Sequence, residues 1–111
     1  MHICNYNIVV SGIRFEWDEA KNLSNQRKHG ISFEQASQVF LDPLFLSVLD
    51  RVQDGEQRWR TYGKVKGWLL MMVAHTVRET GEHSRTVEVM RIISARPATR
   101  KERQRYEDEN G

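Results

Sequence analysis

Arginines are the most numerous residues that could take part in chemistry, and they are concentrated in the second half of the chain. Residues 58–106 carry 12 Lys and Arg against 4 Asp and Glu, whereas residues 1–57 carry 5 against 8. A guanidinium is planar and permanently charged, and it can bind two oxygens of a phosphate at once. The charge excess therefore favours a polyanionic partner, either nucleic acid or an acidic protein. A solvated surface with internal ion pairs is an equal alternative.

Arg91 stands in a segment with the alternation of a β-strand, residues 86–95. Alternation places it on the same face as apolar neighbours, which are Val87, Val89, Ile93 and Ala95. A charge on such a face must be paired, reach the rim of the sheet or face an open groove. Two interpretations stay open: an ion pair with Glu56 or Glu88, or a place in a phosphate-binding groove.

Arg96 ends the same strand next to Pro97, just before a predicted helix. Backbone amides at a helix start attract anions, and Arg96 would add further donors beside them. Ser94 lies on the same strand face as Arg96. An ion pair at the strand end is the alternative for Arg96. The basic residues of the following helix are more typical of a solvated or partner-docking face; they are Arg100, Lys101, Arg103 and Arg105.

Metal-free RNA cleavage would need a proton acceptor for the 2′-hydroxyl, cations for the charged phosphorane and an acid for the leaving oxygen. Histidine suits proton transfer because its ordinary pKa, about 6.5, lies near working pH. His29, next to Lys28, is the candidate, although it could simply be a favourable charge at a helix C-terminus. His75 lies in an apolar strand, where a buried, hydrogen-bonded histidine is the more typical role.

Metal and nucleotide cofactors are not expected. Cys4 is the only cysteine, and the histidines are scattered, at His2, His29, His75 and His83. No glycine-rich loop leads from a strand into a helix, so side chains would have to act unaided. The lone cysteine favours a reducing compartment, the longest apolar run (68–74) is too short to cross a bilayer, and the N-terminus lacks a signal-peptide pattern. We therefore expect a cytoplasmic protein.

Two helices are predicted before residue 44. Asp18 is a natural N-cap, and Gly30 is a natural stop after His29. Ser32 and Gln35 have the spacing of a capping box and predict a second helix, which ends at Asp42-Pro43.

Four strands and a last helix follow. We predict strands at 45–49, 58–65, 68–77 and 86–95, with a hairpin loop at 78–85 and a helix from Thr99 to about Tyr106. The expected order is β-α-α-β-β-β-β-α, an α+β fold with an antiparallel sheet packed against two N-terminal helices. Segment 68–74 is apolar throughout, so its strand should be central. Trp17 and Trp68 are expected in the core, whereas Trp59 could lie exposed.

The ordered set of motifs resembles the BrnT toxins over about residues 14–106. The matching residues are Phe15-Glu16-Trp17-Asp18, Lys21, Asn25, Lys28-His29-Gly30, the run from Ile31 to Ala36, Val39-Phe40, Asp42, Glu56, Arg58, Gly63, His75-Thr76, Arg78, the run from Arg91 to Arg96, Ala98-Thr99, Glu102-Arg103 and Tyr106. No single piece is decisive; their order and spacing are specific. Residues 1–13 would be an N-terminal extension or edge strand, and 107–111 an acidic tail.

The resemblance implies a RelE-like fold and a type II toxin, a metal-independent ribonuclease that stops translation. It implies a BrnA-type antitoxin with a ribbon-helix-helix part, through which the complex binds its own operator DNA. The expected catalytic residues are His29, Lys28, Arg58, Arg91 and Arg96; RNA-binding ones are Arg78, Ser94 and Arg100; antitoxin-binding ones are Lys101, Arg103, Arg105 and Tyr106.

Two features depart from the family pattern. Pro97 stands where a basic residue is expected, which puts one phosphate contact in doubt, and the family says nothing about residues 1–13. Two other functions stay open: a non-catalytic module that binds RNA or the antitoxin, and an interaction domain with ion-paired arginines.

Overall fold

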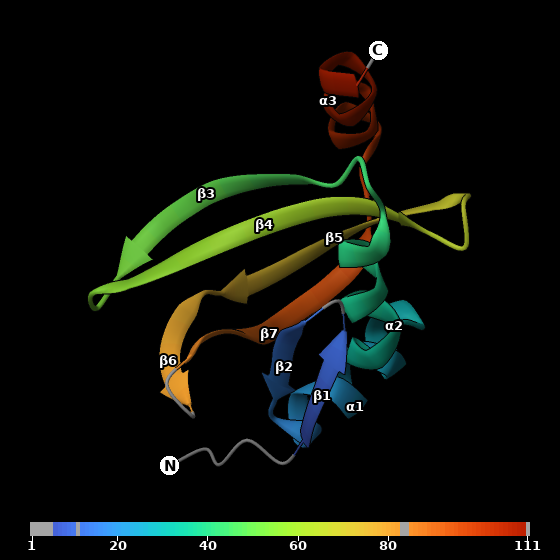
Figure 1. The fold of residues 1–111 in the computed structure, drawn as a ribbon. Coiled ribbons are helices and arrows are strands. Elements are labelled where there is room, and N and C mark those ends of the chain that lie inside the picture. The colour runs from blue at the N-terminus through green and yellow to red at the C-terminus, as the bar shows by residue number, and fades with distance from the viewer. Residues whose placement is uncertain (1–5, 11, 83–84, 111) are drawn as a thin grey trace.

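A computed structural model describes residues 6–10, 12–82 and 85–110 (Figure 1). Its elements are β1 (Tyr6–Val10), β2 (Ile13–Trp17), α1 (Glu19–His29), α2 (Phe33–Ser37), the 3₁₀ helix η1 (Gln38–Leu41), β3 (Leu46–Gln53), β4 (Glu56–Val65), β5 (Leu69–Thr76), β6 (Arg78–Glu82), β7 (Arg85–Pro97) and α3 (Arg100–Asn110). His2, Cys4 and His83, which the sequence analysis considered, lie outside the described residues.

The fold is α+β, but its sheet is mixed rather than antiparallel. The strand order is β1-β2-β7-β5-β4-β3, and β6 also pairs with β7. All pairs are antiparallel except β2 and β7, which run parallel. A parallel pair needs a long connection. Here that connection contains α1, α2, η1 and strands β3 to β6, so the local sequence pattern gives no sign of the pairing.

The hairpin loop predicted at 78–85 is wrong over its first part, because residues 78–82 form β6. His75 pairs with Ile92 and Arg78 with Val89, which is one continuous register. Strands β5 and β6 therefore act together as a long partner of β7, interrupted only at Val77 (Figure 1). Gly81 favours a turn, but pairing with β7 keeps this segment extended.

The capping residues predicted for the N-terminal helices are confirmed. The Asp18 side chain accepts a hydrogen bond from the Ala20 N–H at 2.8 Å, and Gly30 ends α1 with φ +70°. Ser32 and Gln35 form both bonds of a capping box. The second helix differs from the prediction, because it has only five α-helical residues before it tightens into η1.

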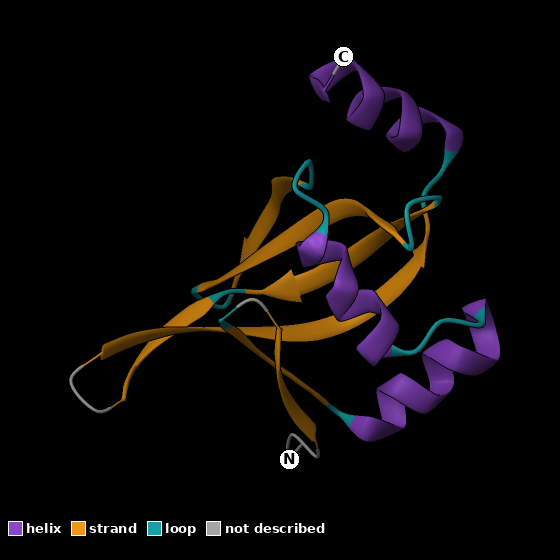
Figure 2. Ribbon diagram, turned by 45° about the vertical axis from the view of Figure 1, so that its right-hand side comes forward, coloured by secondary structure: helices purple, strands orange, loops and turns teal. Residues whose placement is uncertain are grey.

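Side chains on the two faces of the sheet form separate clusters. On one face, α2 and η1 cover the main core, which includes Phe15, Trp17, Phe33, Val39, Phe40, Met71, Val73, Ile92 and Ala95. On the other, α3 places Tyr106 against Tyr62, Leu70 and Met72. In both ribbon views α3 lies far from α1 and α2 (Figures 1 and 2). Strand β5 is central and buried, as predicted, but Trp68 is 68% exposed because it follows the Lys66-Gly67 turn.

Helix α1 is held mainly by asparagines. Asn25 accepts a hydrogen bond from the Ala95 N–H of β7 at 3.2 Å and donates one to the Ile31 carbonyl at 2.9 Å. Asn22 accepts one from the Phe33 N–H at 2.8 Å. These bonds place α1 beside β7 and at the start of α2.

Helix α3 continues beyond its predicted end at Tyr106. Residues 107–110, expected as a tail, form its last turn, and the Asn110 side chain donates to the Leu44 carbonyl at 3.2 Å. Within the described ranges, no helix has the length and apolar character needed to cross a membrane.

Candidate functional site

Arginines of β3, β4 and β7 surround a cleft of about 290 Å³ on the sheet face that carries α3, and β5, which lies between β4 and β7, also contributes to its lining. Its lining includes Asp50 and Arg51 of β3, Arg58 and Arg60 of β4, and Ser94 and Arg96 of β7. We call it the arginine cleft. It brings together three of the residues predicted from the sequence, namely Arg58, Arg96 and Ser94.

Strand alternation and one β-bulge turn these side chains to the same face. Arg60 pairs with Ala74, which in turn pairs with Ser94, so the three share a face. The register shifts between Ala74 and His75, which leaves Ile93 as an extra residue in β7. Ala95 consequently lies in the main core, and the prediction that it shares a face with Arg91 is wrong.

Glu56 links Arg58 of the cleft to Arg91, a predicted site residue that lies outside the cleft lining. Its Oε1 accepts a hydrogen bond from Nη2 of Arg91 at 3.1 Å and lies 3.5 Å from Nη2 of Arg58. Of the two interpretations left open for Arg91, the ion pair with Glu56 is confirmed. Within the described part of the chain, Nε of Arg58 is buried without a hydrogen-bond partner, and so is Nε1 of Trp59. The Arg58 Nε–H is therefore shielded from solvent, although its side chain as a whole is 25% exposed.

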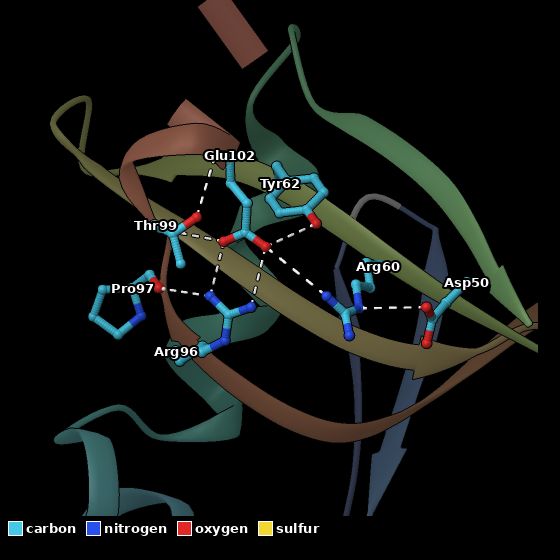
Figure 3. Close-up of polar contacts among 7 residues, drawn as sticks. All are labelled: Asp50, Arg60, Tyr62, Arg96, Pro97, Thr99 and Glu102. Carbon is cyan, nitrogen blue, oxygen red and sulfur yellow. Dashed lines mark hydrogen bonds and ion pairs between the residues drawn. The ribbon is translucent and has the colours of Figure 1, made fainter. Parts of the chain in front are cut away.

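Glu102 of α3 joins Arg96 and Arg60 (Figure 3). Arg96 binds it in bidentate fashion, with Nη1 to Oε1 at 2.8 Å and Nη2 to Oε2 at 3.1 Å. Arg60 lies between two carboxylates: its Nε is 3.7 Å from Oδ1 of Asp50, and its Nη1 is 4.0 Å from Oε2 of Glu102. The bond from Arg96 lowers the pKa of Glu102 to about 2, so this carboxylate stays charged near neutrality. Arg96 therefore makes the strand-end ion pair that was its alternative role.

Sequence reasoning missed Arg60 as a site residue. Its side chain is 42% exposed, and it lines the cleft beside the predicted Arg58. Alternation along β4 was the available signal, because residues 58 and 60 must point to the same face. Arg51 and Asp50 were missed because they lie between the predicted strands at 45–49 and 58–65, whereas β3 in fact continues to Gln53.

Several predicted residues lie elsewhere. Lys28 and His29 are exposed at the end of α1 and are not part of the cleft lining. Arg78 lies on β6, outside the lining, and is paired with Glu16 of β2. The structure therefore does not bring Lys28, His29 and Arg78 together with Arg58 and Arg96 in the arginine cleft, because they belong to α1 and β6.

The predicted antitoxin-binding residues divide into two groups. Lys101 and Arg105 are exposed on α3, as is Arg100, and Arg103 is partly exposed. Tyr106 instead points inward: it is 3% exposed, and its hydroxyl donates to Oδ2 of Asp42 at 2.5 Å. It anchors α3 on the sheet, so its side chain is not available at the surface.

His75 is the buried, hydrogen-bonded histidine that the sequence predicted. It is 1% exposed, its Nε2 lies 2.7 Å from Oγ1 of Thr61, and its ring packs edge-on against Phe40. Burial lowers its pKa to about 4, so the ring is neutral at pH 7.

The arginines make the cleft a site of fixed positive charge interleaved with carboxylates, which is suited to binding an anion such as phosphate. Within residues 6–10, 12–82 and 85–110, no three His, Cys, Asp or Glu side chains form a metal-binding group.

Comparison with known proteins agrees with the resemblance. The family model described as "Ribonuclease toxin, BrnT, of type II toxin-antitoxin system" matches residues 17–102. A solved structure, the ribonuclease toxin BrnT of Brucella abortus, is similar with 24% identity over 76% of this chain and 94% of that chain, at a TM-score of 0.49. A search of curated proteins gave no significant match. On the family match, which spans most of the chain, this protein belongs to the BrnT family of ribonuclease toxins of type II toxin–antitoxin systems.

Proposed function

We propose that the arginine cleft binds RNA and cleaves it without a metal ion, by attack of a 2′-hydroxyl on the adjacent phosphate. The observation that carries this proposal is the gathering of Arg58, Arg60 and Arg96 around one cleft, with Arg91 linked to them through Glu56. Charge builds up on the phosphate oxygens in the transition state, and preorganised cations stabilise that charge more than they stabilise the ground state.

Arg60 is the main candidate for phosphate contact. Its distances to both neighbouring carboxylates exceed a hydrogen bond, and it is the more exposed of the two β4 arginines. Arg58 adds a second permanent charge to the lining of the cleft, and Ser94 adds a hydroxyl on the same face. Pro97 stands where the family pattern has a basic residue and has no charge to contribute. Phosphate binding would therefore depend on these other side chains.

Proton transfer has two sets of candidates. Glu56 is a carboxylate held between Arg58 and Arg91, near the reacting phosphate that these arginines would bind. His29 and Lys28, expected from the sequence, take part only if bound RNA extends from the cleft to the end of α1. Glu56→Gln and His29→Gln variants separate the two assignments, because only the variant that removes the proton carrier flattens the pH–rate profile.

The test is cleavage of a defined RNA by purified protein in EDTA. We expect cleavage by the wild type and losses of about tenfold or more for Arg60→Ala, Arg91→Ala and Arg96→Ala. Arg27→Ala, an exposed substitution on α1, is the matched control. Intact RNA with the wild type would reject the ribonuclease assignment for this chain and favour a non-catalytic binding module.

The family also implies an antitoxin partner. We propose a BrnA-type ribbon-helix-helix antitoxin that docks on the exposed basic face of α3, around Lys101, Arg103 and Arg105, and binds operator DNA. In a cell the free toxin would act in the cytoplasm and inhibit translation. Induction should therefore arrest growth and protein synthesis, and co-expression of the antitoxin should restore both. Charge reversal of the three α3 residues should weaken the complex while RNA cleavage persists.

A further inference from the structure

Glu102 is the point at which α3 meets the arginine cleft. Its carboxylate binds Arg96 of β7 through both oxygens and accepts a hydrogen bond from the Tyr62 hydroxyl of β4 at 3.1 Å. The backbone N–H of Thr99 donates to Oε1 at 2.8 Å, and Nη1 of Arg60 lies 4.0 Å from Oε2. The side chain is only 16% exposed. The Glu102 carboxylate therefore connects α3 to β7 through Arg96 and to β4 through Tyr62, and it also lies near Arg60.

These contacts fix the plane of the Arg96 guanidinium. A bidentate pair with a carboxylate sets both the distance and the orientation of the planar group. Nη1 of Arg96 also donates to the Pro97 carbonyl at 3.1 Å. Of the five guanidinium N–H groups, Nε–H and one on Nη2 lie outside these bonds. Arg96 can therefore stay bound to Glu102 while it donates to a phosphate.

We infer that Glu102 is a positioning residue, which holds Arg96 in the orientation that meets the phosphate of bound RNA. The inference rests on the proposed ribonuclease function of the cleft. It makes the first turn of α3 part of the site, although the rest of that helix faces solvent or the antitoxin.

The charge of Glu102 gives this inference a distinctive signature. Replacing the carboxylate with an amide makes the cleft more positive, which favours binding of a polyanion. The same change releases Arg96 from its fixed orientation, which slows a reaction that depends on geometry. A positioning role therefore predicts opposite effects on RNA binding and on RNA cleavage. A carboxylate that merely competes with phosphate predicts that both increase.

The test compares Glu102→Gln with Thr99→Ala. Thr99 Oγ1 accepts the Glu102 N–H at 3.2 Å, so its loss weakens the cap of α3 without removing a contact to an arginine. We expect Glu102→Gln to lower the single-turnover cleavage rate about tenfold or more, while the Kd for a non-cleavable 2′-deoxy analogue stays equal or falls. Thr99→Ala should cleave within about twofold of the wild type. Faster cleavage by Glu102→Gln, or an equal loss in both variants, would overturn the inference.

A second measurement does not depend on activity. In NMR spectra of ¹⁵N-labelled free protein, the Nη signals of Arg96 should show hindered rotation in the wild type and in Thr99→Ala, and free rotation in Glu102→Gln. Hindered rotation that persists in Glu102→Gln would contradict the inference. If the wild type fails to cleave RNA, the proposed function fails, while these spectra still decide whether Glu102 positions Arg96.

Discussion

The two faces of strands β4, β5 and β7 are built differently although they share one backbone. On the face under α2 and η1, side chains such as Val73, Ile92 and Ala95 are buried in a continuous apolar core. On the opposite face, the same strands carry Arg58, Arg60 and Arg96 around a cleft, and α3 adds only a small apolar cluster around Tyr106.

This difference indicates that the core face of the sheet mainly stabilises the fold, whereas the cleft face mainly carries the chemistry. Alternation along a strand lets successive residues serve opposite purposes, because each points away from its neighbour. Burial of apolar area stabilises the fold, whereas partly exposed ion pairs contribute little to it. Substitutions on the core face should therefore change mainly the unfolding free energy, and substitutions on the cleft face mainly the activity.

The largest expected effect comes from the core face. Phe33 is fully buried and its ring lies edge-on to Trp17, with centroids 6.1 Å apart. Phe33→Ala should lower the unfolding free energy by about 3–5 kcal/mol, because it removes apolar contacts and leaves a cavity. Urea denaturation followed by circular dichroism measures this loss. A loss below about 1 kcal/mol would show that the core does not depend on α2.

The next largest effect concerns the pH dependence of stability that comes from the buried, neutral His75. Its pKa is about 4 in the folded protein and about 6.5 when unfolded, so between these values the unfolded chain binds the extra proton. The contribution of neutral His75 to the unfolding free energy is fully present above pH 6.5. It declines by about 3 kcal/mol as the pH falls from 6.5 toward 4. Denaturation curves at several pH values measure it. In His75→Gln the decline between pH 6.5 and 4 should be smaller; an unchanged decline would assign it to other groups.

The third effect belongs to the cleft face. Arg60→Ala should lower the cleavage rate about tenfold to a hundredfold, which corresponds to about 1.4–2.7 kcal/mol of transition-state stabilisation. The unfolding free energy should change by less than about 1 kcal/mol, because Arg60 is partly exposed and its carboxylate contacts are long. Cleavage and urea unfolding are measured on the same preparation. Equal losses of transition-state stabilisation and of unfolding free energy would contradict the separation of stability and activity between the two faces.

The smallest effect is expected at Arg78. It pairs with Glu16 across β6 and β2 and lies outside the cleft. The Arg78 side chain is half exposed, so Arg78→Ala should change the unfolding free energy by no more than about 1 kcal/mol and leave cleavage within about twofold. A large loss of cleavage without unfolding would instead extend the site to Arg78, in line with the RNA-binding role that the family resemblance implies.

Local signals explain what the sequence predicted well. Caps depend on residues two or three positions apart, so Asp18, Ser32 and Gln35 sufficed to place the starts of α1 and α2. The arginine cleft was partly predictable for the same reason, because alternation fixes which residues of one strand share a face. The family resemblance supplied the remaining site residues.

Long-range pairing explains part of what the sequence did not predict. The parallel pairing of β2 with β7 joins segments far apart in the chain, such as Phe15 and Met90. Strand β6 was missed for a different reason: it pairs with β7, the next strand along the chain, but Gly81 favoured a loop. The bulge at Ile93 moved Ala95 into the core, and nothing in the alternating pattern marks it. The place of α1 beside β7, set by Asn25, likewise separates His29 from the cleft.

The most direct test of the division between the faces is an NMR titration with a non-cleavable 2′-deoxy oligonucleotide, observing the arginine Nε–Hε signals. We predict that the signals of Arg58, Arg60 and Arg96 shift on binding, and that Arg27, exposed on α1, does not respond. Shifts at Arg27 with unmoved cleft arginines would place RNA on the α1 side and contradict the account.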